Sequence, residues 1–355
     1  MIVTILSGGV GGARFARGVR EHLYRVAPDG NGGTTADIRV IVNTSDDMWL
    51  AGLRITPDLD SIMYTLAGAN DEVRGWGRVG ETERVSGELR AYGVGWPWFT
   101  LGDLDIGTHL ARSSFLREGM TLSEATQRIT ARWDLGVTLL PVTDSEVETL
   151  VLVDGHSLVD GHSLVDGDSL VDGDNGIGEG TPLHFQEWWT RHRAAIPARG
   201  FVQNNVEQAV PAPGVVEAIA AADVVLVAPS NPVVSIGTVL GIPGIREALA
   251  GASAPIIGIS PIINGSVVRG MADACLSAIG VETSAQAVAE HYGSRSAGGL
   301  LDAWLIDEVD APAASLINAA GIRTAVVPLW MRDVPTTVQL VADAMAAADQ
   351  VTARA

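Results

Sequence analysis

The chain has 355 residues, of which 47% are hydrophobic and 18% charged, and its formal net charge is −19. This composition is typical of a globular protein with a large core, and its negative field argues against binding nucleic acid or an anionic membrane. All 23 basic residues are arginine and Cys275 is the only cysteine, which excludes Schiff-base chemistry on lysine, cysteine metal sites and disulfides within the chain. Because the sequence opens without a signal-like segment and has no membrane-length apolar run, we expect a cytoplasmic protein.

A glycine-rich loop follows the first apolar segment. Residues 2–6 are uncharged and mostly β-branched, which predicts a strand buried on both faces of a parallel sheet. The loop after it contains Gly8, Gly9, Gly11 and Gly12. A strand that leads through such a loop into a helix can present backbone N–H groups to a phosphate or diphosphate. Arg14 stands where the dinucleotide fingerprint needs glycine or alanine, which disfavours an ordinary NAD-type site. The alternative to a phosphate-binding loop is a glycine turn that only lets the helix pack closely on its strand.

Four carboxylates are expected beside this loop. A second buried strand, predicted at residues 38–42, is followed by Asp46 and Asp47. Ligands of open α/β sheets bind beyond the carboxyl ends of the strands, so these carboxylates should lie near the glycines. With Asp58 and Asp60, they form a candidate Mg2+ cluster, because Mg2+ prefers one or two carboxylates plus phosphate oxygens. In the alternative interpretation Asp60 is a helix N-cap and Asp46 or Asp47 a turn residue.

An inserted subdomain is predicted between the two parts of the α/β core. Residues 1–47 and 141–355 have α/β character, whereas residues 48–140 look mainly helical and rich in loops. Trp76 and Arg78 lie in a glycine-flanked loop of this insert, in a chain that is only 5% aromatic. Such a pair could stack on a flat ring and bind an anion, although a tryptophan that anchors the loop to the core is equally open.

Three further features of the middle of the chain are structural in our interpretation. Thr121 and Glu124 have the spacing of a capping box at the start of a helix. His109 follows a dense polar turn, and we interpret it as a packed surface histidine rather than a base. Residues 154–174 repeat a hexapeptide too few times to build and cap a solenoid, so we interpret them as a mobile, low-complexity hairpin extension without a function.

The α/β pattern resumes after the repeat. Short apolar runs separated by helical patterns predict further parallel strands at residues 223–228, 255–260, 303–306 and 324–328. Ser230, Asn231 and Ser235 follow the first of these runs, and Ser260 closes the second. Small polar groups at strand ends can bind a nucleotide phosphate or base, although each could equally belong to a plain turn. The predicted fold class is therefore α/β, a Rossmann-like parallel sheet with an inserted, mainly helical subdomain.

These segments together resemble the 2-phospho-L-lactate transferase family, which makes the deazaflavin coenzyme F-420, and in particular its actinobacterial branch. The resemblance extends over nearly the whole chain and is carried by residues 8–15, 46–47, 52–54, 57–60, 74–77, 184–189, 228–237 and 270–273. It implies a Rossmann-like core with a helical insert, a homodimer and a requirement for Mg2+. Members transfer a phospholactyl or, in actinobacteria, a phosphoenolpyruvyl group from a guanosine diphosphate conjugate to the terminal ribityl hydroxyl of the deazaflavin Fo, and release GMP.

The chemistry of this reaction fits the candidate residues. Attack of an alcohol on a diphosphate requires that the negative charge on phosphorus is neutralised and that the hydroxyl is aligned. A metal ion on these carboxylates could neutralise the charge, so Asp46, Asp47, Asp58 and Asp60 are the candidate metal ligands, and Asp46 and Asp47 are assigned as catalytic. The predicted substrate-binding residues are Gly8, Gly9, Gly11, Gly12, Arg14, Trp76, Arg78, Ser230, Asn231, Ser235 and Ser260.

The chain departs from the family pattern at two places. Leu104 and Gly107 differ from the residues that the family usually has at these positions. Because the family residue at position 104 is an arginine, the contact expected of that arginine must be absent or come from a neighbour such as Arg78 or Arg112. The hexapeptide repeat replaces what is usually a short hairpin.

The rival function is a non-catalytic, nucleotide-sugar-binding regulator of the same superfamily, which would share the glycine loop but need no tryptophan-rich insert. A nicotinamide-dependent dehydrogenase is disfavoured by Arg14.

Overall fold

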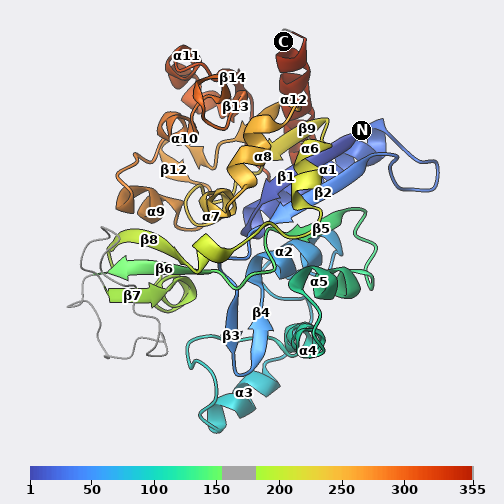
Figure 1. The fold of residues 1–355 in the computed structure, drawn as a ribbon, viewed down its shortest axis with the longest axis vertical. Helices are drawn as coiled ribbons and strands as arrows, with labels where there is room; N and C mark the ends of the chain where they lie inside the picture. Colours follow the sequence, from blue (N-terminus) through green and yellow to red (C-terminus); the bar gives the residue numbers. More distant parts are fainter. Residues whose placement is uncertain (154–180, 354–355) are drawn as a thin grey trace.

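A sheet of seven parallel strands organises the molecule (Figure 1). The computed structural model describes residues 1–153 and 181–353. Along the sheet the strands are β14 (Arg323–Val326), β13 (Ala303–Ile306), β10 (Ile256–Ile259), β9 (Val224–Val227), β1 (Ile2–Ser7), β2 (Asp37–Val42) and β5 (Thr138–Pro141). In the central register Ile5 of β1 lies between Val40 of β2 and Leu226 of β9. The predicted α/β fold with a parallel sheet is confirmed.

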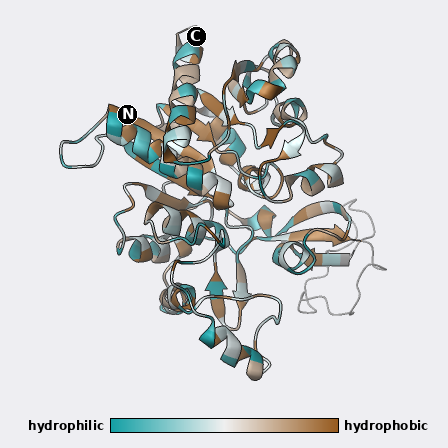
Figure 2. Ribbon diagram, turned by 180° about the vertical axis from the view of Figure 1, so that it is seen from behind, coloured by the Kyte–Doolittle hydropathy of each residue, from teal (hydrophilic) through white to brown (hydrophobic). Residues whose placement is uncertain are grey.

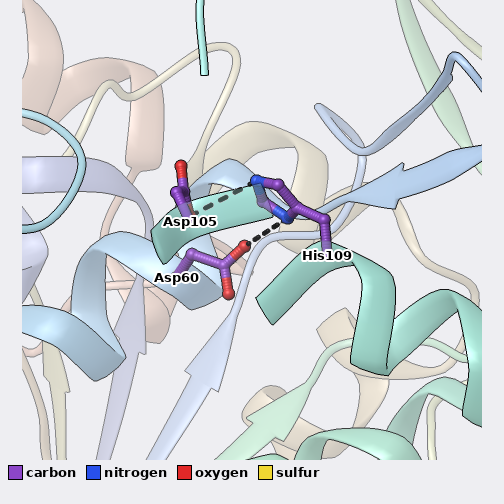
Figure 3. A group of neighbouring side chains, drawn as sticks. All are labelled: Asp60, Asp105 and His109. Atoms are coloured by element: carbon purple, nitrogen blue, oxygen red, sulfur yellow. Dashed lines mark ion pairs between the residues drawn. The ribbon is translucent and has the colours of Figure 1, made fainter. Parts of the chain in front are cut away.

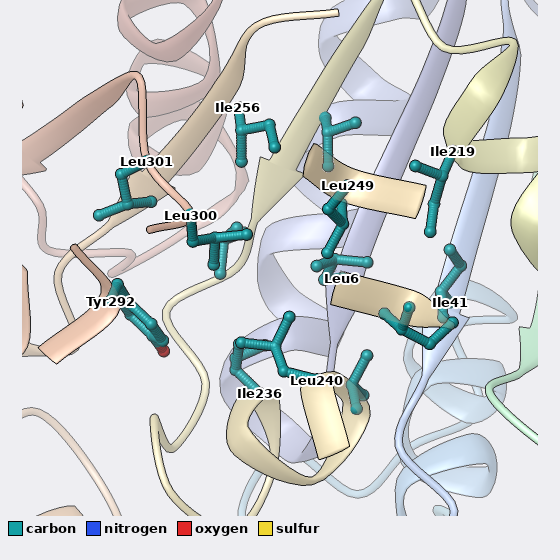
Figure 4. Close-up of a cluster of buried hydrophobic side chains, with 14 of the residues drawn as sticks. Leu6, Ile41, Ile219, Ile236, Leu240, Leu249, Ile256, Tyr292, Leu300 and Leu301 are labelled. Carbon is teal, nitrogen blue, oxygen red and sulfur yellow. The ribbon is translucent and has the colours of Figure 1, made fainter. Parts of the chain in front are cut away.

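Helices cover both faces of this sheet because its strands are apolar on both sides. Ile5 belongs to a core that includes residues of α1 and α12, whereas the next residue, Leu6, faces the opposite core with Ile219 and Leu240 (Figure 4). Figure 2 shows the hydrophobic character of the central strands. The helices are α1 (Gly9–Val26), α2 (Pro57–Leu66), α3 (Arg84–Ala91), α4 (Asp103–Arg117), α5 (Leu122–Thr130), α6 (Val215–Ala220), α7 (Ile236–Gly241), α8 (Ile245–Gly251), α9 (Ala272–Ala278), α10 (Ala285–Tyr292), α11 (Ala314–Ala319) and α12 (Val334–Thr352).

Smaller antiparallel sheets lie outside the central one. They are the hairpin of β3 (Met48–Leu50) and β4 (Leu53–Ile55), the pair β11 (Ile262–Ile263) and β12 (Ser266–Val267), and a sheet of β7 (Thr181–His184), β6 (Glu148–Val153) and β8 (Ala198–Asn204). The hairpin, α3 and α4 lie at the lower end of Figure 1, away from both termini. The helical, loop-rich pattern predicts no clear strand between residues 71 and 140; β5, which begins at Thr138, corrects this, because a short strand needs no long apolar run when a neighbouring strand supplies its pairing. The β3–β4 hairpin, in the region expected to be mainly helical, was not predicted.

Several local predictions can be compared directly with the structure. The capping box of Thr121 and Glu124 is confirmed at the start of α5, with both reciprocal hydrogen bonds formed. The predicted hairpin extension at residues 154–174 lies outside the described residues. No helix in the described ranges is both long and apolar enough to cross a membrane. The division into a core and an insert at residues 48–140 stays a prediction.

Candidate active site

The glycine loop joins β1 to α1 and is packed tightly by its neighbours. Ser230, at the carboxyl end of β9, accepts the Gly8 N–H at 3.1 Å and donates to the Gly8 carbonyl at 2.7 Å. A Cβ on Gly8 would come within 2.8 Å of Asp58 Oδ2, and one on Gly12 within 2.0 Å of Ser7 Oγ. Close packing therefore accounts for part of the glycine pattern, and it brings Asp58 to the amino end of α1.

Asp58 faces the start of α1 from the first turn of α2. Its Oδ2 accepts a hydrogen bond from Asn43 Nδ2 at 3.0 Å. Asn43 is itself held, because its Oδ1 accepts the Ser45 N–H at 3.0 Å and the Thr238 hydroxyl at 2.8 Å. Burial raises the pKa of Asp58 to about 6, although hydrogen bonds from Asn43 and from the Gly9 N–H oppose the shift. Asn43, which we had not singled out, thus orients a site carboxylate.

Asp46 and Asp47 follow β2 and carry unpartnered oxygens. Both are buried, and neither Asp46 Oδ1 nor the two carboxylate oxygens of Asp47 have a hydrogen-bond partner among the described residues. Burial raises the pKa of Asp46 well above its ordinary range, and the charges of Asp58 and Asp47 raise it further. Burial likewise raises the pKa of Asp47, although the charges of Arg54 and Arg112 oppose it. Buried anions without partners are costly, and a bound cation would relieve that cost.

Asp60 belongs to a different set of contacts (Figure 3). Arg112 Nη2 donates a short hydrogen bond to Asp60 Oδ1, and His109 Nδ1 lies 3.5 Å from Asp60 Oδ2. His109 Nε2 lies 3.3 Å from Asp105 Oδ1, which also accepts the Tyr64 hydroxyl at 2.7 Å. These contacts connect α4 to α2 through buried polar side chains.

Two predictions about this network are wrong. His109 is 1% exposed and not a surface histidine, because Asp105, His109 and Arg112 lie on the face of α4 that packs against α2. Asp60 is not the N-cap, because α2 begins at Pro57, with Thr56 in the cap position. Asp60 instead accepts the Thr56 hydroxyl at 3.1 Å.

This network also contains a group that could hold a metal ion. One ligand atom from each of Asp60, Asp105 and His109 lies within 4.8 Å of the others, and all three residues are buried. However, the Arg112 guanidinium already supplies a positive charge to Asp60. A metal ion here would compete with that arginine. Asp46 Oδ1 and both carboxylate oxygens of Asp47, in contrast, have no hydrogen-bond partner among the described residues, although Arg54 Nη2 lies 3.7 Å from Asp47 Oδ2.

The polar residues at the other strand ends mostly bond within their own turns. Asn231 Oδ1 accepts the N–H groups of Val233 and Val234, at 2.9 and 3.2 Å. Ser260 Oγ likewise accepts the N–H of Ile262 and donates to its carbonyl. Ser235 packs against the glycine loop, since a Cβ added to Gly8 would lie 2.6 Å from the Cβ of Ser235.

Trp76 and Arg78 have different surroundings. Trp76 is 43% exposed, and the Arg74 guanidinium lies 4.1 Å from its ring centroid. Arg78 is buried near the rings of Tyr64 and Trp133, and it donates to the carbonyl of Leu104 at 3.3 Å.

Arg14 and the Trp76 loop border the same region. Arg269 donates to the Gly75 carbonyl at 3.5 Å, and its pKa is lowered by burial and by the charge of Arg14. Arg14 and Arg269 therefore bring two positive charges to one side of this loop. A site for an anion is consistent with this arrangement.

His184 lies at the end of β7, under an aromatic cluster. Its ring centroid is 5.9 Å from that of Trp96, which stacks on Trp98 at 4.7 Å. Burial, and next the charge of Arg54, lowers the pKa of His184 to about 4. The sequence identified this histidine only as part of a family segment, because nothing in its local pattern indicates that it is buried.

We expect His184 to make the folded protein less stable as the pH falls. The unfolded chain protonates this side chain near its ordinary pKa of 6.5 and the folded chain only near 4, so acid favours unfolding within that window. Between about pH 7 and about pH 5 the free energy of unfolding should fall by about 2 kcal/mol, because a shift of one pKa unit corresponds to about 1.4 kcal/mol. Urea unfolding of the wild type and His184→Gln at both pH values measures it. Between the two pH values the free energy of unfolding of the variant should fall by about 2 kcal/mol less than that of the wild type. An equal fall in both proteins would contradict the lowered pKa of His184.

The fold and the site define an α/β protein with a ligand site at the carboxyl ends of its parallel strands. A doubly wound parallel sheet carries, at the carboxyl ends of its strands, a glycine loop and a buried acidic cluster suited to a cation. The chain belongs to the 2-phospho-L-lactate transferase CofD family, whose model matches residues 3–329. The resemblance seen in the sequence is thereby confirmed.

Relatives that match nearly the whole chain are named phosphoenolpyruvate transferases. The chain is 49% identical to a phosphoenolpyruvate transferase of Streptomyces coelicolor, over 99% of each chain. It is 51% identical to that of Streptomyces avermitilis, over 99% of each chain, and 50% identical to that of Thermobifida fusca, over 94% of this chain and 93% of the other.

Solved structures support the fold alone. Two crystal structures of the Bacillus halodurans protein BH3568, described in one of them as a member of the UPF0052 family, align with TM-scores of 0.53 and 0.58. Their sequence identities are 17% and 16%, and they cover 92% and 97% of this chain and 92% and 99% of the other.

Proposed function

We propose that this chain transfers a phosphoenolpyruvyl or 2-phospho-L-lactyl group from a guanosine diphosphate conjugate to the ribityl hydroxyl of the deazaflavin Fo. The products are dehydro coenzyme F-420-0, or F-420-0, and GMP. The observation that carries the proposal is the group of buried carboxylate oxygens on Asp46 and Asp47 that have no hydrogen-bond partner in the described part of the chain. The family match and the full-length relatives support the same assignment.

The residues of the site would act mainly by binding and orienting the reactants. In α1 the first N–H groups have no acceptor within the helix, so those beyond Gly9 can bind phosphate oxygens. Asn43 fixes Asp58 beside that helix end. A raised pKa makes a carboxylate a stronger base, so whichever of Asp46 and Asp47 is not bound to the metal is suited to accept the proton of the attacking hydroxyl.

The acidic residues would also hold Mg2+. We propose that its ligands come from Asp46, Asp47 and Asp58, because Asp46 and Asp47 have oxygens without a hydrogen-bond partner among the described residues and Asp58 is close enough to act on Asp46 electrostatically. Asp60 was predicted as a fourth ligand, and its pairing with Arg112 makes it the weakest of the four. When bound, Mg2+ would neutralise charge on the diphosphate. The resemblance also implies a homodimer, which we retain as a proposal.

We expect Trp76→Ala to weaken Fo binding about tenfold and to leave GDP binding unchanged. The exposed indole, with Arg74 over one face, offers a flat surface for a planar ring beside the positive charges of Arg14 and Arg269. Titration of each ligand followed by fluorescence or calorimetry measures the effect. Trp330→Ala, at another exposed tryptophan, is the control. Equal loss of Fo and GDP binding would instead indicate that the loop unfolds.

The proposed function is tested by one assay. Purified protein is incubated with Fo, Mg2+ and either the enolpyruvyl or the lactyl conjugate, and both GMP and the deazaflavin product are quantified. Formation of both products in equal amounts is expected for at least one donor. Binding of the nucleotide without any turnover of either donor would favour the rival regulator.

A further inference from the structure

Two buried side chains, Arg54 and His184, have donor atoms without a hydrogen-bond partner among the described residues. Arg54 is 2% exposed, and its Nη1 has no acceptor among the described residues, while its Nη2 lies 3.7 Å from Asp47 Oδ2. His184 is 7% exposed, and its Nε2 also has no partner there. An unpaired buried donor is costly, and more so when it is charged. Both atoms therefore indicate a ligand that accepts hydrogen bonds.

The tautomer of His184 makes its free nitrogen a donor. His184 Nδ1 accepts the N–H of Gln186 at 3.1 Å, so the proton of the neutral ring is on Nε2. Since burial and the charge of Arg54 keep the pKa of this ring near 4, the neutral form holds at physiological pH. Two N–H donors, one charged and one neutral, are thus available in the same region.

Both donors flank the segment that carries the site carboxylates. Arg54 is in β4, the second strand of the hairpin that follows that segment, and its side chain reaches back to Asp47. His184 is opposite Leu150 of β6, and the preceding residue, Thr149, donates its N–H to the Ser45 carbonyl at 2.6 Å. Trp96 packs against the His184 ring, with 5.9 Å between the two ring centroids. The two donors therefore lie beside the acidic cluster on separate elements.

The unpartnered atoms of this region are of two opposite kinds. Asp46 Oδ1 and both Asp47 carboxylate oxygens lack a hydrogen-bond donor among the described residues, whereas Arg54 Nη1 and His184 Nε2 lack an acceptor there. We propose that Arg54 Nη1 and His184 Nε2 bind the carboxylate of the three-carbon acid that the reaction transfers. The inference rests on the proposed function, which assigns a donor whose acid carries such a carboxylate. GDP lacks this group, so the two residues would determine the preference for the conjugate over GDP.

The test compares the affinity for GDP with that for the lactyl conjugate of GDP. Arg54→Gln and His184→Leu should each weaken binding of the conjugate by about tenfold to a hundredfold, the range expected for a lost charge-assisted hydrogen bond. GDP affinity should stay within about twofold, because GDP does not reach these atoms. The KM for Fo should change as little. Calorimetry with each nucleotide, and initial rates with Fo varied, provide these values.

Conservative variants separate binding from structure. His184→Gln keeps an N–H donor and should retain more conjugate affinity than His184→Leu, and Arg128→Gln, at an arginine with a side chain 53% exposed, should behave as wild type. Unchanged conjugate affinity in Arg54→Gln and His184→Leu, or an equal loss of GDP and conjugate, would overturn the proposal. If Arg54→Gln fails to fold, the His184 pair decides. Failure of the proposed function itself would look different, because the wild type would then not turn over the conjugate.

Discussion

Replacing Asp46 or Asp47 with asparagine should lower the turnover number by about three to four powers of ten while the protein stays folded. Asparagine keeps the size of the side chain and removes its charge, and stabilising the charge of phosphoryl transfer is worth several kcal/mol, at about 1.4 kcal/mol per power of ten. Asp46→Asn should not lower stability, because burial and the charges of Asp58 and Asp47 already raise the pKa of Asp46. Asp47→Asn should lower it without unfolding the protein, because it leaves the buried Arg54 without its ion-pair partner. Initial rates and urea unfolding of each variant measure the two effects.

The same experiment includes metal removal. EDTA should abolish wild-type activity and added Mg2+ should restore it, while Asp46→Asn should need more Mg2+ for half-maximal activity, because Asp46 interacts electrostatically with Asp58. Asp349→Asn, at an exposed carboxylate on α12, is the matched control and should keep full activity. Full activity of the Asp46→Asn, Asp47→Asn double variant in EDTA would remove both residues and the metal from the mechanism.

The central sheet could be predicted because its strands are buried on both faces. Residues 2–6 are uncharged and mostly apolar, and residues 303–306 are an uninterrupted apolar run; such runs are recognisable without tertiary information. β5 contains only Thr138–Pro141 at the sheet edge, where pairing with β2 compensates for a weak sequence signal. The short β3–β4 hairpin was missed for the same reason.

The candidate site was predictable only in part. The glycine loop and the acidic residues could be placed together because carboxyl ends of parallel strands share one edge of the sheet. The pairing of Asp60 with Arg112 could not, because the two residues lie on separate helices and meet only when α4 packs on α2. The spacing of Asp105, His109 and Arg112 does indicate one helix face, yet the sequence does not say whether that face is buried. Arg54 and His184 likewise meet the site only through the packing of β4 and β7.

Replacing Arg112 with methionine should destabilise the protein by about 3 to 5 kcal/mol, the range for removing one partner of a buried ion pair. Arg112 is 2% exposed, and its guanidinium contacts Asp60, His109 and the Arg54 carbonyl. Methionine fills much of the same volume, so the loss should come from leaving Asp60 charged and unpaired. Urea unfolding at neutral pH measures the change in the free energy of unfolding.

A double variant identifies the source of this loss. Adding Asp60→Asn to Arg112→Met removes the buried charge and should recover most of the stability, whereas independent contributions would make the two losses add. Arg128→Met, at the exposed arginine on α5, should cost less than about 0.5 kcal/mol. If Arg112→Met is no less stable than Arg128→Met, the pair does not connect α4 to α2. Recovery of the single Arg112→Met variant on addition of a divalent cation would instead show that Asp60, Asp105 and His109 bind a metal once the arginine is gone.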